Sequence, residues 1–178
     1  MQCLNIKNKE VAALLKEYTK ILGNENAAYY VLSENNGYGL DKAPNGEPSK
    51  LFSDLLEHYN GDRVAAIQAK ARTYSKSFKE WFGDWQSEDK TNVSKVVDEN
   101  SEPLLVWHGT TENFDAFSKS WRGATDPGDW GLGFYFSPKK SSSEMYGNIL
   151  MPVFLSIKNP VPNEKFQMIN SFGREKVK

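Results

Sequence analysis

The sequence predicts an α+β protein, with a helical N-terminal lobe followed by a core of short strands. Apolar residues recur with helical spacing up to about Trp85. The polar stretch QSEDKTNVS comes next and is typical of a linker. After it, short strand-like runs alternate with turn residues. Because the period of the apolar residues changes here, we expect one domain over residues 1–85 and a second over residues 94–178.

The composition is that of an ordinary globular protein. The chain has 178 residues, of which 39 % are hydrophobic, and this is enough for an ordered core. The net charge of −1 favours neither nucleic acid nor an anionic membrane as a partner. One cysteine excludes an intramolecular disulfide, and no run is apolar enough for a signal peptide or a membrane span. We therefore expect a cytoplasmic protein with no membrane partner.

Four helices are predicted in the N-terminal lobe, each between a capping residue and a turn. The fourth carries apolar residues as far as Phe82, which predicts one uninterrupted helix. Aromatic residues near its end have helical spacing, which favours packing in a core over a platform for stacking a ligand. These aromatic residues are Phe78, Trp81, Phe82 and Trp85. The predicted helices begin after Asn8, at Glu25, after Ser49 and after Asp62.

The second half of the chain contains five strand-like runs, namely KVV, LLVWHG, FDAF, GFYFS and MPVFLSI. The segment KVVDENSEPLLVW predicts a hairpin with Asn100 in its loop. A short helix is expected from Ser141 to Tyr146, with Ser141 as its cap.

Two features of this half can carry chemistry. His108 ends an apolar strand and precedes Gly109, and a glycine at a strand end lets the backbone approach a ligand closely. Further on, Gly131 and Gly133 flank Leu132 ahead of an apolar strand. This is not a dinucleotide-binding fingerprint, because a strand and not a helix follows it. Taken singly, both features are equally compatible with a structural role.

Their order and spacing resemble the catalytic core of the diphtheria-toxin-like ADP-ribosyltransferases, the class that includes the poly-ADP-ribose polymerases. That family has a His-Gly-Ser/Thr strand end, a Gly-x-Gly strand with a tyrosine, and a helix with Ser-x-x-Tyr. The sequence also resembles ADP-ribosyltransferase-like domains of polyvalent proteins from phages and mobile elements, through FKEWFGDW and SKVVDENSEP. The matching segments are His108-Gly109-Thr110, Gly131 to Phe136 and Ser143 to Tyr146.

The resemblance implies a fold with a split β-sheet core and NAD as the substrate, with no metal. Tyr135 and Tyr146 would sandwich the cationic nicotinamide ring by stacking and cation–π attraction. Gly109 would bind the carboxamide through its main chain, with help from Ser143. Arg122 would face the pyrophosphate, or else be an ordinary solvated loop arginine. The implied catalytic residues are His108 and Tyr135, and the implied NAD-binding residues are Gly109, Thr110, Arg122, Gly133, Ser143 and Tyr146.

The family also supplies a glutamate from a later strand, and no glutamate here is recognisable as its counterpart. Only Glu164 and Glu175 follow the MPVFLSI strand, and neither lies in a convincing strand. We therefore expect a sheet that is incomplete at its C-terminal side, with an edge that can recruit a partner chain. Three functions stay open: transfer of ADP-ribose to a protein or nucleic-acid acceptor, non-catalytic NAD binding, and hydrolysis of NAD.

Overall fold

The computed structural model describes residues 4–118, 120 and 133–161, and they form two compact units. The first unit contains residues 4–105 together with Phe154–Ser156. The second contains the described residues of 106–153 and those from Ile157 onward. The architecture is α+β, with helices in the N-terminal part and a small sheet after them, as the sequence predicts. In these ranges no helix has both the length and the apolar character needed to cross a membrane.

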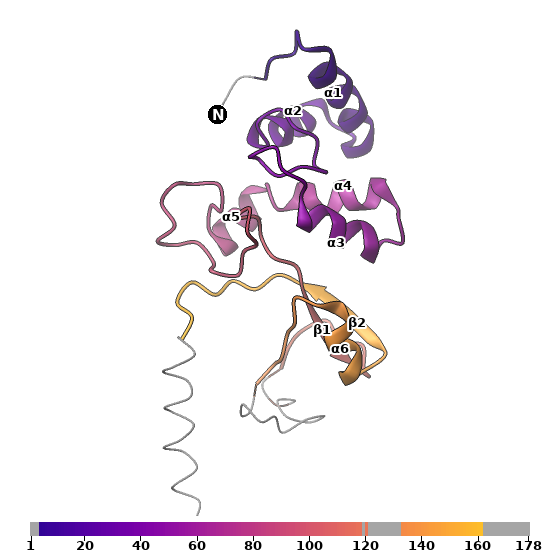
Figure 1. Cartoon of the computed structure of the whole chain (residues 1–178), viewed down its shortest axis with the longest axis vertical. Coiled ribbons are helices and arrows are strands. Elements are labelled where there is room, and N and C mark those ends of the chain that lie inside the picture. Colours follow the sequence, from indigo (N-terminus) through magenta and orange to yellow (C-terminus); the bar gives the residue numbers. More distant parts are fainter. Residues whose placement is uncertain (1–3, 119, 121–132, 162–178) are drawn as a thin grey trace, which may run out of the picture. The chain divides into compact units, whose positions relative to one another are not determined.

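The first unit is built from five helices, and Figure 1 shows α3 and α4 lying side by side. Their predicted caps are confirmed, because side-chain oxygens of Asn8, Ser49 and Asp62 accept backbone N–H groups in the first turns. Gly23 ends the first helix in the left-handed conformation, with φ of 71°. The helices are α1 (Lys9–Leu22), α2 (Glu25–Glu34), α3 (Lys50–His58), α4 (Arg63–Arg72) and α5 (Lys76–Phe82).

The prediction of one uninterrupted helix up to Phe82 is wrong, because the chain breaks between α4 and α5. The carbonyl of Thr73 accepts a hydrogen bond from the Trp85 indole at 3.0 Å. That carbonyl is then engaged by a distant residue, whereas a continuous helix would have it accept the N–H four residues later. Ser75 caps α5 by accepting the N–H of Phe78. The same serine therefore starts a new helix.

A buried ion pair joins α4 to the hairpin that precedes the sheet. The ammonium of Lys70 lies 2.6 Å from Oε1 of Glu102, and both side chains are fully buried. Lys70 also donates to the hydroxyl of Ser49, which in turn donates to Glu102 at 2.6 Å. Burial lowers the pKa of Lys70 and raises that of Glu102, and each charge partly offsets the shift of the other.

The predicted hairpin is confirmed as a tight turn around a single bridge between Val97 and Pro103. Ser101 in its loop has φ of 61°, in the left-handed region. The hairpin places Glu102 against the helices, and so belongs to the first unit.

Aromatic packing around α5 completes the first unit. Phe82 and Trp85 are buried, whereas Trp81 is 49 % exposed. Phe78 packs on Phe82 and on Phe154, with ring centroids 5.2 and 5.3 Å apart. The prediction of core packing is therefore confirmed for Phe78, Phe82 and Trp85. Phe154, which packs on Phe78, comes from the segment that follows the sheet.

The second unit contains a two-stranded antiparallel sheet, β1 (Val106–Thr110) and β2 (Ile149–Val153) (Figure 1). Its register pairs Trp107 with Pro152 and His108 with Met151. On its other side, Trp107 exchanges two main-chain hydrogen bonds with Ser137. Because the N–H and C=O of one strand residue point to the same side, Ser137 lies at the edge of β1 opposite to β2. β1 is therefore the central element of this unit.

Four sequence predictions for this unit are corrected. The run GFYFS, residues 133–137, forms one isolated bridge, between Ser137 and Trp107, and no strand. The FDAF run, residues 114–117, has bends at Asp115 and Ala116 and no strand, and the rings of Phe114 and Phe117 pack against His108. The strand predicted at MPVFLSI begins earlier, since β2 runs from Ile149 to Val153 and the next residues pack in the first unit. The helix predicted from Ser141 is the short α6 (Lys140–Ser143) followed by the 3-10 turn η2 (Glu144–Tyr146), with Lys139 and not Ser141 at the cap position.

Candidate active site

The C-terminal end of β1 brings together most of the residues that the sequence singled out. His108, Gly109 and Thr110 are consecutive residues of this strand. Successive side chains of a strand point to opposite faces, so His108 and Gly109 present different faces of β1. The site is therefore described face by face.

The face of His108 is aromatic. Its ring lies 5.1 Å from Phe117, 5.4 Å from Phe136 and 6.0 Å from Phe114, measured between centroids. On its edge, Nδ1 lies 2.8 Å from the carbonyl oxygen of Tyr135. A carbonyl can only accept, so Nδ1 carries the proton. In the neutral imidazole this leaves Nε2 with a lone pair that can accept a hydrogen bond.

The opposite face of β1 is covered by α6 and η2. The buried hydroxyl of Ser143 donates to the carbonyl of Trp107 at 2.8 Å. The ammonium of Lys140 lies 5.3 Å from the centroid of the Trp107 ring. These two contacts dock the turn containing Ser143 and Tyr146 onto the strand.

Two glycines make this docking possible. A Cβ on Gly109 would lie 1.9 Å from the carbonyl oxygen of Ser143 and 3.2 Å from Cβ of Tyr146. A Cβ on Gly147 would lie 2.1 Å from the carbonyl oxygen of Thr110. No side chain fits in either space, so both positions require glycine for close backbone approach. Sequence reasoning missed Gly147, although its place directly after the Ser-x-x-Tyr segment was a usable signal.

The remaining predicted residues are placed less tightly. The hydroxyl of Thr110 bonds Glu112, by donating to its carbonyl and accepting its N–H. Gly133 needs no close approach, since a Cβ added there meets no heavy atom of the described residues within 4 Å. Arg122, Gly131, Leu132, Glu164 and Glu175 lie outside the described residues.

Two exposed side chains of this site lie on the turn η2. Tyr146 is 41 % exposed and Met145 is 79 % exposed. An aromatic ring with a free face beside a glycine strand end is a suitable surface for a flat ligand. Ser143 is different, because burial and its bond to Trp107 commit its only proton to the protein.

The strand end at Gly109 and the Ser-x-x-Tyr turn are segments through which the sequence resembles the ADP-ribosyltransferases. Residues 98–177 match a family model described as ADP-Ribosyltransferase in polyvalent proteins. This segment of the chain is therefore an ADP-ribosyltransferase-like domain of the kind found in polyvalent proteins, and the resemblance in the sequence is confirmed. Comparison with curated proteins and with solved structures gave no significant match.

Proposed function

We propose that this domain binds NAD at the end of β1 and transfers its ADP-ribose to a protein or nucleic-acid acceptor. The family match supports activity of the ADP-ribosyltransferase type in general. The observation that carries NAD as the donor is the packing of Ser143 and Tyr146 over Gly109, which only a glycine permits. This packing places the main chain of Gly109 next to the exposed ring of Tyr146. Nicotinamide needs main-chain groups for its carboxamide and an aromatic face for its ring.

The main chain of Gly109 suits the carboxamide of nicotinamide. Trp107 directs its N–H and C=O to Ser137, away from β2, and Gly109, two residues on, directs its own to the same edge. A donor and an acceptor side by side can bind a carboxamide through its oxygen and its NH2 group. Ser143 can add an acceptor to that amide, since its proton is already used by Trp107.

The rings of Tyr135 and Tyr146 would hold the nicotinamide between them. Phe134 and Phe136 both contact Phe117 on the face of His108. In an extended segment the residue between them points the other way, which is the face of Gly109 and Tyr146. The positive charge of the nicotinamide ring is attracted to two aromatic faces.

His108 would fix the pose of a ribose. With Nδ1 donating to Tyr135, neutral Nε2 accepts a hydrogen bond from a ribose hydroxyl. In the reaction the bond between ribose C1 and the nicotinamide nitrogen breaks, and nicotinamide leaves with the electron pair. A nucleophile of the acceptor then bonds to C1 and loses its proton. The intermediate cation at C1 is of the oxocarbenium type known from glycoside cleavage.

The test is calorimetric titration with NAD, run beside an assay with NAD labelled in its adenylate part. Saturable binding, followed by label on a protein or nucleic-acid acceptor, is the expected result. Release of nicotinamide without label on any acceptor would indicate hydrolysis of NAD instead. An absence of NAD binding by the folded chain would contradict the proposal altogether.

A further inference from the structure

A pocket of about 670 Å³ lies in the helical unit, and none of the predicted NAD-binding residues lines it. One wall is α1, from Asn8 to Glu17, and the other is the chain from Ser33 to Lys42. Gly39 lies close to α1, because a Cβ there would lie 3.3 Å from the Leu14 side chain and 3.4 Å from the Tyr18 hydroxyl. Leu4, Val11 and Leu14 contribute its apolar surface.

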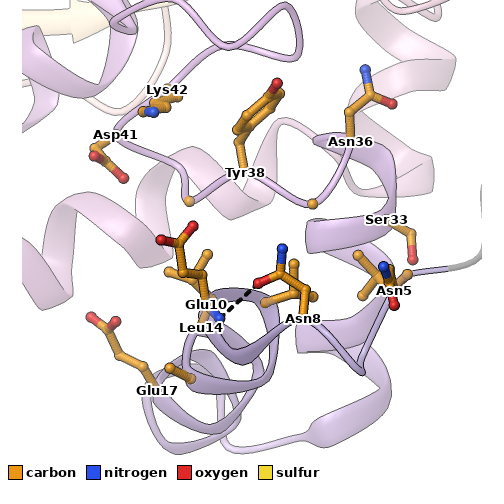
Figure 2. Close-up of a pocket in the computed structure, with 15 residues that line it drawn as sticks. Asn5, Asn8, Glu10, Leu14, Glu17, Ser33, Asn36, Tyr38, Asp41 and Lys42 are labelled. Carbon is orange, nitrogen blue, oxygen red and sulfur yellow. Dashed lines mark hydrogen bonds between the residues drawn. The ribbon is translucent and has the colours of Figure 1, made fainter.

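One end of this pocket is acidic. Figure 2 shows Glu10, Glu17 and Asp41 on the same side of the pocket, on the left of the view. Glu17 forms an ion pair with Arg63, whose Nε lies 3.6 Å from its carboxylate. The ammonium of Lys42 lies over the ring of Tyr38. Among the described residues the carboxylates of Glu10 and Asp41 have no cationic partner within ion-pair distance. Lys42 lines the same end beside Asp41, but Glu10, Glu17 and Asp41 outnumber Lys42 and Arg63, so this end keeps a net negative charge and is complementary to a positive charge.

The other end is rich in uncharged hydrogen-bonding groups. Asn5, Ser33 and Asn36 lie on the right of the view in Figure 2. The hydroxyl of Ser33 is unpartnered within the described part of the chain, although this side chain is only 3 % exposed. A buried hydroxyl without a partner costs free energy unless a bound molecule satisfies it. Asn36 uses its amide N–H group on the Pro44 carbonyl, which leaves its oxygen as an acceptor.

We propose that this pocket binds a basic stretch of polypeptide, with a lysine or arginine side chain at the acidic end and peptide groups at the Asn5–Ser33–Asn36 end. A peptide offers N–H and C=O groups along its length, so it satisfies donors and acceptors alike. A protonated polyamine has donors but no hydrogen-bond acceptor. It therefore cannot accept from the side-chain amides of the two asparagines or from the Ser33 hydroxyl. The apolar wall formed by Leu14 accommodates the methylene stem of a long basic side chain.

The test is fluorescence anisotropy of the full chain with a fluorescein-labelled tetra-arginine peptide, compared with a tetra-alanine peptide. The variant that combines Glu10→Gln with Asp41→Asn should weaken tetra-arginine binding at least about fivefold. Its matched control combines Glu25→Gln with Glu88→Gln, which changes the charge equally outside the pocket, and should bind as the wild type does. Ser33→Ala should weaken binding about twofold to tenfold without lowering the melting temperature, because the hydroxyl has no partner to lose.

Three outcomes would overturn the proposal. Equal weakening in both double variants would mean that tetra-arginine responds only to the total charge. Displacement of the peptide by spermine at equal molar concentration would make the pocket a polyamine site. Binding of tetra-arginine no tighter than that of tetra-alanine would leave the pocket without the predicted ligand.

Discussion

The carbonyl oxygen of Tyr135 accepts a hydrogen bond from Nδ1 of His108, with 2.8 Å between the two atoms. A residue of the segment that follows Gly133 thereby sets the tautomer of the histidine at the end of β1. The contact uses the main chain of Tyr135 and not its ring.

Replacing His108 by asparagine should separate its structural role from its binding role. The asparagine amide can still donate to the Tyr135 carbonyl, but it has no atom at the place of Nε2. Because asparagine keeps the hydrogen bond but loses the ring contacts with the phenylalanines, we expect His108→Asn to melt closer to the wild type than His108→Ala does, while NAD affinity falls by about 2- to 10-fold. His108→Ala should have both a lower melting temperature and a lower affinity for NAD. Calorimetric titration and thermal melting decide, and unchanged NAD affinity in the asparagine variant would remove His108 from the site.

Gly109 and Gly133 form a second matched pair. A methyl group at Gly109 collides with the Ser143 carbonyl, whereas one at Gly133 meets no heavy atom of the described residues within 4 Å. Gly109→Ala should therefore destabilise the fold by about 1–3 kcal/mol, with a melting temperature lowered by several degrees. Gly133→Ala should melt close to the wild type. Equal melting temperatures for the two variants would mean that α6 does not pack on β1 as described.

Tyr146 offers a test of nicotinamide stacking that leaves the fold intact. Its side chain is 41 % exposed, and the neighbouring Met145 is 79 % exposed. We expect Tyr146→Ala to weaken NAD binding by about two- to thirtyfold, the value of a cation–π contact. Met145→Ala serves as the control and should bind as the wild type does. If both variants bind NAD equally well, the stacking site lies elsewhere.

Breaking the buried pair of Lys70 and Glu102 on one side only should strongly destabilise the first unit. Glu102→Gln leaves an ammonium ion buried without its counter-charge, which costs about 3–5 kcal/mol of the free energy of unfolding. Adding Lys70→Met should recover much of that loss, because the unpaired charge is then gone. The control is Glu80→Gln, which removes an exposed pair with Lys76 and should cost less than about 1 kcal/mol. Urea unfolding measures all four proteins, and similar losses for Glu102→Gln and Glu80→Gln would contradict the burial of the pair.

Transfer of ADP-ribose should be slow relative to NAD binding. The transition state develops positive charge at the ribose, and the sequence places no recognisable strand glutamate to meet it. Losing one preorganised electrostatic group costs about 10²–10³ in rate. Glu164→Gln and Glu175→Gln should therefore change the rate of nicotinamide release by less than about twofold. Rapid release that either substitution abolishes would identify the catalytic carboxylate and overturn this expectation.

Local signals predicted the helices of the first unit well, and the one failure among them has a tertiary cause. Caps at Asn8, Ser49 and Asp62 act within a few residues of the sequence, so they are readable from it. The break after α4 depends on Trp85, twelve residues away from the Thr73 carbonyl that it binds. No local period reports such a contact, because the apolar stripe continues across the break.

The sequence by itself determined the α+β class and the caps, because these depend on local pattern, and its resemblance to a known family singled out His108, Gly109, Ser143 and Tyr146. Only the tertiary structure decided what those residues touch. Gly109 requires a glycine because a carbonyl thirty-four residues later would lie 1.9 Å from any Cβ, and the histidine tautomer depends on a carbonyl twenty-seven residues later. Sequence spacing carries no information on such close approaches, since they arise when separate segments pack against one strand.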